Sequence, residues 1–154
     1  MESAKKWVKS AFHEYYKNKG KLLQLKSDYQ KISIPGAGGQ TGLPGHGSGT
    51  NGVEKSVLHY LVDKERIENA IKDCENKIAV VEKTLHHFTM EEIAKGKKHS
   101  KYIRCRFLKC MSYTRAAIEC EISERASDYW IEEIFNMAIA IAEAEGYIKR
   151  VAKS

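Results

Sequence analysis

The chain has 154 residues, of which 42% are apolar and 30% are charged. This balance is typical of a soluble protein with a packed core and excludes a disordered chain, while the lack of any run of about 18 apolar residues excludes a membrane span. The formal net charge of +6 favours polyanions as partners, although charge alone does not identify one.

The segment from 1 to 34 mixes lysines with aromatic residues and has no continuous apolar block, so we expect no secretory signal and a cytoplasmic location. Its apolar positions recur at alternating steps of four and three, which predicts one amphipathic helix. These seam positions are Ala4, Val8, Ala11, Tyr15, Asn18, Leu22, Leu25, Tyr29 and Ile32. The lysines also suit a membrane surface or a nucleic-acid backbone, but the regular seam favours a packed helix with a solvated lysine face.

Residues 35–52 hold eight of the eleven glycines and both prolines, and they contain no Asp, Glu, Lys or Arg. This composition predicts a flexible linker or an exposed loop. Gly47, Gly49 and Gly52 have the spacing of a phosphate-binding turn, but no predicted strand precedes them, so composition alone accounts for the match.

Residues 53–94 are predicted to form one long helix with a seam of five heptads, which is typical of a coiled-coil contact. The seam consists of Val53, Val57, Tyr60, Lys64, Ile67, Ile71, Cys74, Ile78, Val81, Leu85 and Phe88. Lys64 is the polar exception, and a charge at a seam lowers stability and helps to select register or oligomeric state. The pattern fits a hairpin with the N-terminal helix as well as pairing with a second copy, and we expect a homo-oligomer, with a dimer favoured.

Four cysteines, at 74, 105, 110 and 120, show neither a C-x-x-C pair nor the spacing of a zinc finger. We therefore expect reduced thiols on the buried sides of helices, with no metal and no other cofactor.

Near residue 95 the pattern changes to short helices with strong boundary signals. Thr89 with Glu91 and Glu92 behind it has the form of a capping box, which leaves open a new helix start inside the range 53–94, while Gly96 weakens any continuation. Residues 101–108 form the next predicted helix, which would support the segment that follows. Its buried face would consist of Ile103, Phe107 and Cys110.

Two serines eleven residues apart, Ser112 and Ser123, are placed to cap helices over 113–120 and from 124 past 144. A helix-turn-helix needs a small residue midway along the first of these helices, apolar residues at its end and in the turn, and a bulky anchor further on. Those places are filled by Ala117, Cys120, Ile122 and Trp130. Glu121 stands where glycine is commonest in the turn, so the standard turn requires it to adopt a left-handed backbone.

The sequence therefore predicts an all-α fold in which long heptad-patterned helices, as a coiled-coil stalk or a hairpin, precede a helix-turn-helix domain over 95–154. The predicted base-reading residues at the start of its last helix are Glu124, Arg125, Ser127 and Asp128. Arginine suits guanine and a carboxylate suits the amino group of cytosine, although acids are also favoured at any helix start. The predicted phosphate contacts are Lys97, Lys98, Lys101, Arg104, Lys109, Ser112, Tyr113 and Arg115.

The stretch from Tyr113 to Arg125 resembles the second helix, turn and Ser-capped recognition helix of the ArpU and RinA-like bacteriophage regulators, a group related to the helix-turn-helix of sigma-factor region 4. The resemblance extends over residues 102–144. It implies a transcriptional regulator that activates phage late or lytic genes in the cytoplasm or nucleoid of a bacterial host. Double-stranded DNA and RNA polymerase are the partners that it implies.

Three other functions compete with this one. An enzyme is disfavoured, because the chain has no metalloprotease motif, no P-loop and no nucleophile elbow. A small-terminase-like subunit that recognises DNA for phage packaging would share the same sequence signals and would form rings. A helical interaction protein would show no salt-dependent affinity for DNA.

Overall fold

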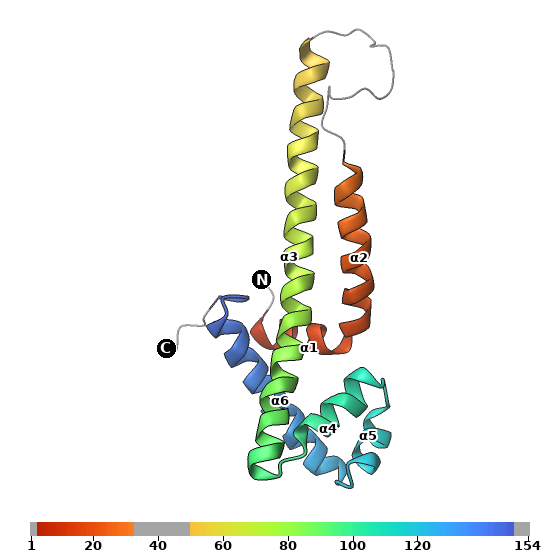
Figure 1. The fold of residues 1–154 in the computed structure, drawn as a ribbon, viewed down its shortest axis with the longest axis vertical. Coiled ribbons are helices and arrows are strands. Elements are labelled where there is room, and N and C mark those ends of the chain that lie inside the picture. The colour runs from red at the N-terminus through yellow and green to blue at the C-terminus, as the bar shows by residue number, and fades with distance from the viewer. Residues whose placement is uncertain (1–2, 33–49, 150–154) are drawn as a thin grey trace. The chain divides into compact units, whose positions relative to one another are not determined.

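A computed structural model describes residues 3–32 and 50–149, with side chains described from residue 57 in the second range. Every regular element in these ranges is a helix, which confirms the all-α fold for this part of the chain (Figure 1). The elements in order are α1 (Ala4–His13), α2 (Tyr15–Lys31), α3 (Thr50–Lys95), α4 (His99–Ile103), the π-helical η1 (Arg104–Leu108), α5 (Tyr113–Glu119) and α6 (Glu124–Ala144). No described helix is long and apolar enough to cross a membrane. Most of the predicted 35–52 linker lies outside the described residues.

The N-terminal segment is two helices and not one, because the chain breaks at Glu14, where φ is −109° and ψ is 26°. Ser3 caps α1 by accepting a hydrogen bond from the backbone N–H of Lys6. The heptad spacing runs through the break unchanged, since a bend at one residue alters the axis of the helix without altering the spacing of apolar residues. A sequence pattern therefore could not reveal it.

The helix α3 runs unbroken past Thr89, so the alternative of a new helix start there is wrong. The Thr89 hydroxyl donates to the carbonyl of Leu85 at 2.7 Å inside the helix, which leaves it unable to cap a new one. The helix ends at Lys95, and Gly96 follows with φ of 73°. This left-handed glycine is the expected way to terminate a helix.

The chain forms two compact units, one of residues 1–19 and 75–154 and one of residues 20–74. The first unit contains a core to which α1, the second half of α3, α4, η1, α5 and α6 all contribute. The ring of Phe12 in α1 lies 5.1 Å from that of Phe107 and 5.6 Å from that of Phe135. The core to which residues 95–154 contribute therefore also includes α1 and the second half of α3.

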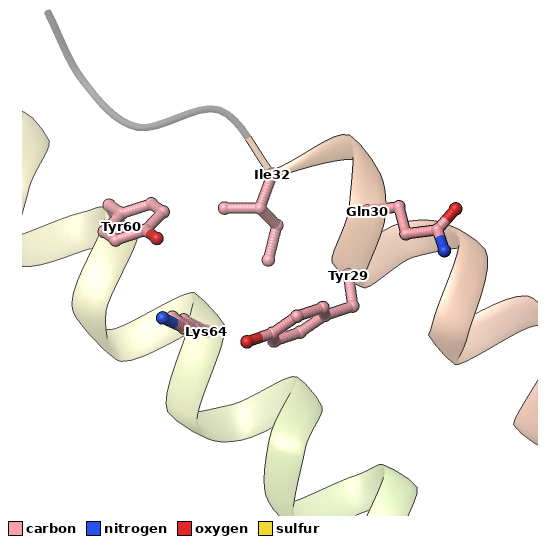
Figure 2. Close-up of a pocket in the computed structure, with 5 residues that line it drawn as sticks. All are labelled: Tyr29, Gln30, Ile32, Tyr60 and Lys64. Atoms are coloured by element: carbon pink, nitrogen blue, oxygen red, sulfur yellow. The ribbon is translucent and has the colours of Figure 1, made fainter. Parts of the chain in front are cut away.

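The second unit pairs α2 with the first half of α3 within one chain. The Tyr29 hydroxyl donates to Glu68 at 3.3 Å, and the Lys64 ammonium lies 6.0 Å and 5.7 Å from the ring centres of Tyr29 and Tyr60. Tyr29, Tyr60 and Lys64 line a cavity of about 290 Å³ together with Gln30 and Ile32 (Figure 2). Among the side chains described from 20 to 73, none is buried. Cys74, at the end of the unit, is buried, so the described part of this unit has one buried side chain and no packed core of its own.

Candidate nucleic-acid interface

The predicted supporting helix begins at His99 and continues through Ile103 as α4 and through Leu108 as η1. Ile103 and Phe107 are buried, as predicted, but Cys110 is exposed and has φ of 54°. The prediction for Cys110 is wrong because the helix ends before it and because the wider π-helical turn shifts the face on which later residues fall. The other three cysteines are buried.

A sharp turn joins α5 to α6. Ser112 caps α5 by accepting from the N–H of Arg115 at 3.1 Å, and Ala117 within α5 is buried, which allows a close approach. After α5 ends, Glu121 adopts a φ of 58°, the left-handed conformation that the standard turn requires. The N–H of Ile122 then donates back to the carbonyl of Ala117 at 3.0 Å and closes the turn.

The first turn of α6 is held from inside by a buried hydrogen bond. Ser123 caps the helix by accepting from the N–H of Ala126 at 3.0 Å, as predicted. Ser127 is fully buried, and its hydroxyl donates to that of Tyr102 at 2.6 Å. Its predicted role in reading bases is therefore wrong: the side chain faces the core and fixes the rotation of α6 about its own axis.

A stack of three rings fixes α6 further along. The imidazole of His99 lies between Phe88 and Trp130, with ring centres at 5.2 Å and 4.4 Å and nearly parallel planes. Burial lowers the pKa of His99, and the Glu133 carboxylate, 3.3 Å from Nε2, opposes that shift. The stack joins the end of α3, the start of α4 and the second turn of α6, so α6 cannot tilt without disturbing the core.

The starts of α5 and α6 are joined by hydroxyl groups that donate to acids. The Tyr113 hydroxyl lies 2.7 Å from Oδ1 of Asp128 and 2.6 Å from the carbonyl oxygen of Glu124, so one proton serves two acceptors. The hydrogen bond to Asp128 is the main cause that raises the pKa of Tyr113 to about 12. Thr114 donates to the carboxylate of Glu124 at 3.2 Å. Tyr113, a predicted phosphate contact, is therefore already engaged.

The outward face of α6 combines a cation, two acids and an aromatic ring at helical spacing, namely Arg125, Asp128, Tyr129 and Glu132. Glu132 forms an ion pair with Lys5 at 2.8 Å, and Asp128 accepts from Tyr113. Arg125 and Tyr129 are exposed and form no hydrogen bond or ion pair with another described residue. Sequence reasoning missed Tyr129, although its position four residues after Arg125 placed it on the same face.

The predicted phosphate contacts lie in a stretch of the chain whose charged residues are all basic. Residues 93–118 contain eight Lys and Arg residues and no acid, while residues 119–133 contain six acids and one arginine. Six of the eight predicted side chains are exposed: Lys97, Lys98, Lys101, Lys109, Ser112 and Arg115. Arg104 is half-buried and donates to Thr89 at 3.2 Å, which makes it less available than predicted. A basic surface on α4 and the start of α5 thus adjoins, along the chain, an acidic start of α6.

Comparison with known proteins adds no family to this geometry. No protein-family model matches the sequence, and searches of curated proteins and of solved structures gave no significant match. Within the described ranges, no three His, Cys, Asp or Glu side chains come together as a metal site would require. The function must therefore be inferred from the helices, the turn and the charges described above.

Proposed function

We propose that α5, the turn and α6 form a helix-turn-helix, and that the chain is a sequence-specific DNA-binding regulator. The observation that carries this proposal is the left-handed Glu121 between two Ser-capped helices. A residue other than glycine adopts this conformation at a cost, so it persists only where the surrounding packing requires it. The turn sets α6 at a fixed angle to α5, which is what a helix needs in order to enter a major groove.

Arg125 is the base-reading residue in this proposal, because it is exposed in the first turns of α6. A guanidinium donates two parallel hydrogen bonds to O6 and N7 of guanine. Glu124 and Asp128 are weaker candidates than the sequence suggested, because each already accepts a hydrogen bond from α5.

The basic side chains before α6 supply the contacts to phosphate. Lys97 and Lys98 are exposed just before α4, Lys101 is exposed on α4, and Lys109 and Arg115 are exposed around the start of α5. Lys97 and Arg115 also form long ion pairs of 3.9 Å with Glu91 and Glu119, which leaves Lys98, Lys101 and Lys109 as the more available cations. The proton of the Ser112 hydroxyl stays available to a phosphate oxygen, since the cap uses only its oxygen as an acceptor. Such contacts place a protein on DNA without reading its sequence.

The resemblance to the ArpU and RinA-like regulators supports a role in activating phage genes, with RNA polymerase as a second partner. The heptad seam of α3 before Cys74, where the described side chains are half-buried or exposed, supports a coiled-coil contact between copies. A dimer would present two α6 helices to paired half-sites. Rings of more copies would favour the packaging subunit instead.

A second candidate is a helical interaction protein. The excess of acids over residues 119–133 favours it, because a DNA-reading helix usually carries a positive charge. A basic partner protein would be attracted to the same surface. The two candidates differ in how affinity for DNA depends on salt.

The test is a selection from random double-stranded DNA, followed by fluorescence anisotropy on the enriched duplex at several salt concentrations. We expect Arg125→Ala to weaken cognate binding by about 1 to 3 kcal/mol and random DNA much less. Replacing Lys98 and Lys101 together with Ala should reduce the slope of log K against log salt by about 2 on every sequence.

Arg66→Ala is the matched control, because Arg66 is an exposed arginine of the other unit. It should change neither the affinity for the cognate duplex nor the slope of log K against log salt. If no sequence is enriched and binding does not depend on salt, the chain is not a DNA-binding protein and the interaction candidate replaces it.

A further inference from the structure

We propose that Tyr129 contacts the methyl group of a thymine that lies one or two base pairs from the guanine read by Arg125. This inference rests on the proposed function and specifies its ligand: a duplex in which a guanine and a thymine occur at this spacing.

Tyr129 lies on the same face of α6 as Arg125. The side chain is 61% exposed and lies one turn beyond Arg125 on the outward face of α6. Ser127, by contrast, lies on the inward face of α6, where it contacts Tyr102, and both side chains are fully buried. Because their hydrogen bond and the ring stack around His99 fix the rotation of α6, the face that carries Arg125 and Tyr129 is fixed as well.

Two of the four polar or aromatic groups on this face remain available to a ligand. The acids at 128 and 132 are engaged, one by the Tyr113 hydroxyl and the other by Lys5. Arg125 and Tyr129 have no such partner among the described residues. The face therefore offers a guanidinium and a phenol ring for recognition.

The chemistry of the major groove matches these two groups. Guanine presents two acceptors that suit arginine, and the C5 methyl of thymine is the apolar group that only a T·A pair presents there. Four residues of helix rise about 6 Å, against 3.4 Å for each base pair. The two contacts would thus fall within two base pairs of each other.

The experiment uses the duplex enriched by the selection and a series of duplexes, in each of which one thymine is replaced by uracil. The replacement removes the methyl group alone. The uracil duplex is the one of this series in which the replaced thymine lies one or two base pairs from the guanine. Anisotropy titrations compare the full-length chain with Tyr129→Ala and Tyr129→Phe on both duplexes. Because burial of one methyl group changes a binding constant about fourfold, Tyr129→Ala should lose about that factor on the thymine duplex and nothing on the uracil duplex. Tyr129→Phe should retain the effect, since it keeps the ring.

Tyr16→Ala is the matched control, because Tyr16 is also an exposed tyrosine of the same unit. It should not change binding to either duplex. Equal losses of Tyr129→Ala on both duplexes would overturn the inference, and a loss in Tyr129→Phe as large as that in Tyr129→Ala would assign the contact to the hydroxyl.

The outcomes separate this inference from the function on which it rests. If wild-type protein binds no sequence, the proposed function fails. If binding depends on Arg125 but the effects of Tyr129→Ala and of the missing methyl group are additive, DNA reading stands and only the thymine contact is wrong.

Discussion

The two units share a heptad seam along α3 but differ in what that seam achieves. From Cys74 onward the seam positions Val81 and Phe88 are buried, and so are Val80 and Thr84 beside them. Before Cys74 the seam positions described are half-buried or exposed, and Leu58, Leu61 and Val62 lie exposed nearby. A periodic apolar pattern therefore does not make a core by itself. In the first unit several helices enclose the seam, whereas in the second α2 is the one other helix among the described residues.

The free energy of unfolding should fall much more when a core side chain of the first unit is removed than when an apolar side chain of the second unit is removed. Phe12→Ala should destabilise the chain by about 3 to 5 kcal/mol, because it removes a ring enclosed by Phe107 and Phe135. Leu61→Ala should cost below about 1 kcal/mol, because more than half of that side chain is already exposed. Urea unfolding followed by circular dichroism measures both. Equal losses would mean that the two units do not differ in packing.

The next effect tests whether the buried hydroxyl pair holds α6. Tyr102→Phe should destabilise the first unit by about 1 to 3 kcal/mol, because the buried Ser127 hydroxyl loses its acceptor. The double variant with Ser127→Ala should recover part of this loss, since no hydroxyl is then left unpaired. If the single and double variants are equally stable, the hydrogen bond does not contribute as described.

Acid should destabilise the first unit through His99. Burial holds the folded pKa of His99 below its usual value, so the unfolded chain takes up this proton more readily than the folded one. The stability that neutral His99 provides is therefore complete above about pH 6.5 and decreases as the pH falls below it. Unfolding curves between pH 8 and pH 5 measure the change.

His99→Phe should reduce this pH dependence, because phenylalanine keeps a ring between Phe88 and Trp130 and takes up no proton. His59→Phe is the control, since His59 is an exposed histidine of the other unit. An unchanged pH dependence in His99→Phe would show that other groups cause it.

The smallest expected effect concerns the second unit. Lys64 occupies a seam position and contacts the rings of Tyr29 and Tyr60. Lys64→Ile removes these weak contacts but completes the apolar seam, so we expect a small rise in melting temperature or a change in oligomeric state. Calorimetry and light scattering measure the two. If neither changes, the seam before Cys74 is not a coiled-coil contact.

Local signals predicted much of the fold. The Ser112 and Ser123 caps, the helix end before Gly96 and the left-handed requirement at Glu121 each depend on a few neighbouring residues, and all four agree with the structure. The break at Glu14 could not be predicted, because neither glycine nor proline marks it. Packing against other parts of the chain decides such a break.

The site was harder to predict than the fold. Ser127 was assigned to DNA by its place after the cap, although it lies seven residues before Ile134 and therefore on the same inward face. The hydrogen bond from Tyr113 to Asp128 joins two different helices. The spacing of residues within one helix therefore could not predict it. Tyr129 could have been found by continuing the outward face of α6 one turn beyond Arg125.

The left-handed Glu121 also makes the turn a natural place to engineer. Glycine adopts this backbone without the steric cost that a Cβ atom imposes, so Glu121→Gly relieves strain and removes one negative charge next to a proposed polyanion site. This one substitution should therefore raise the stability of the folded chain and lower its electrostatic repulsion of nucleic acid. Both changes would help in crystallising a complex.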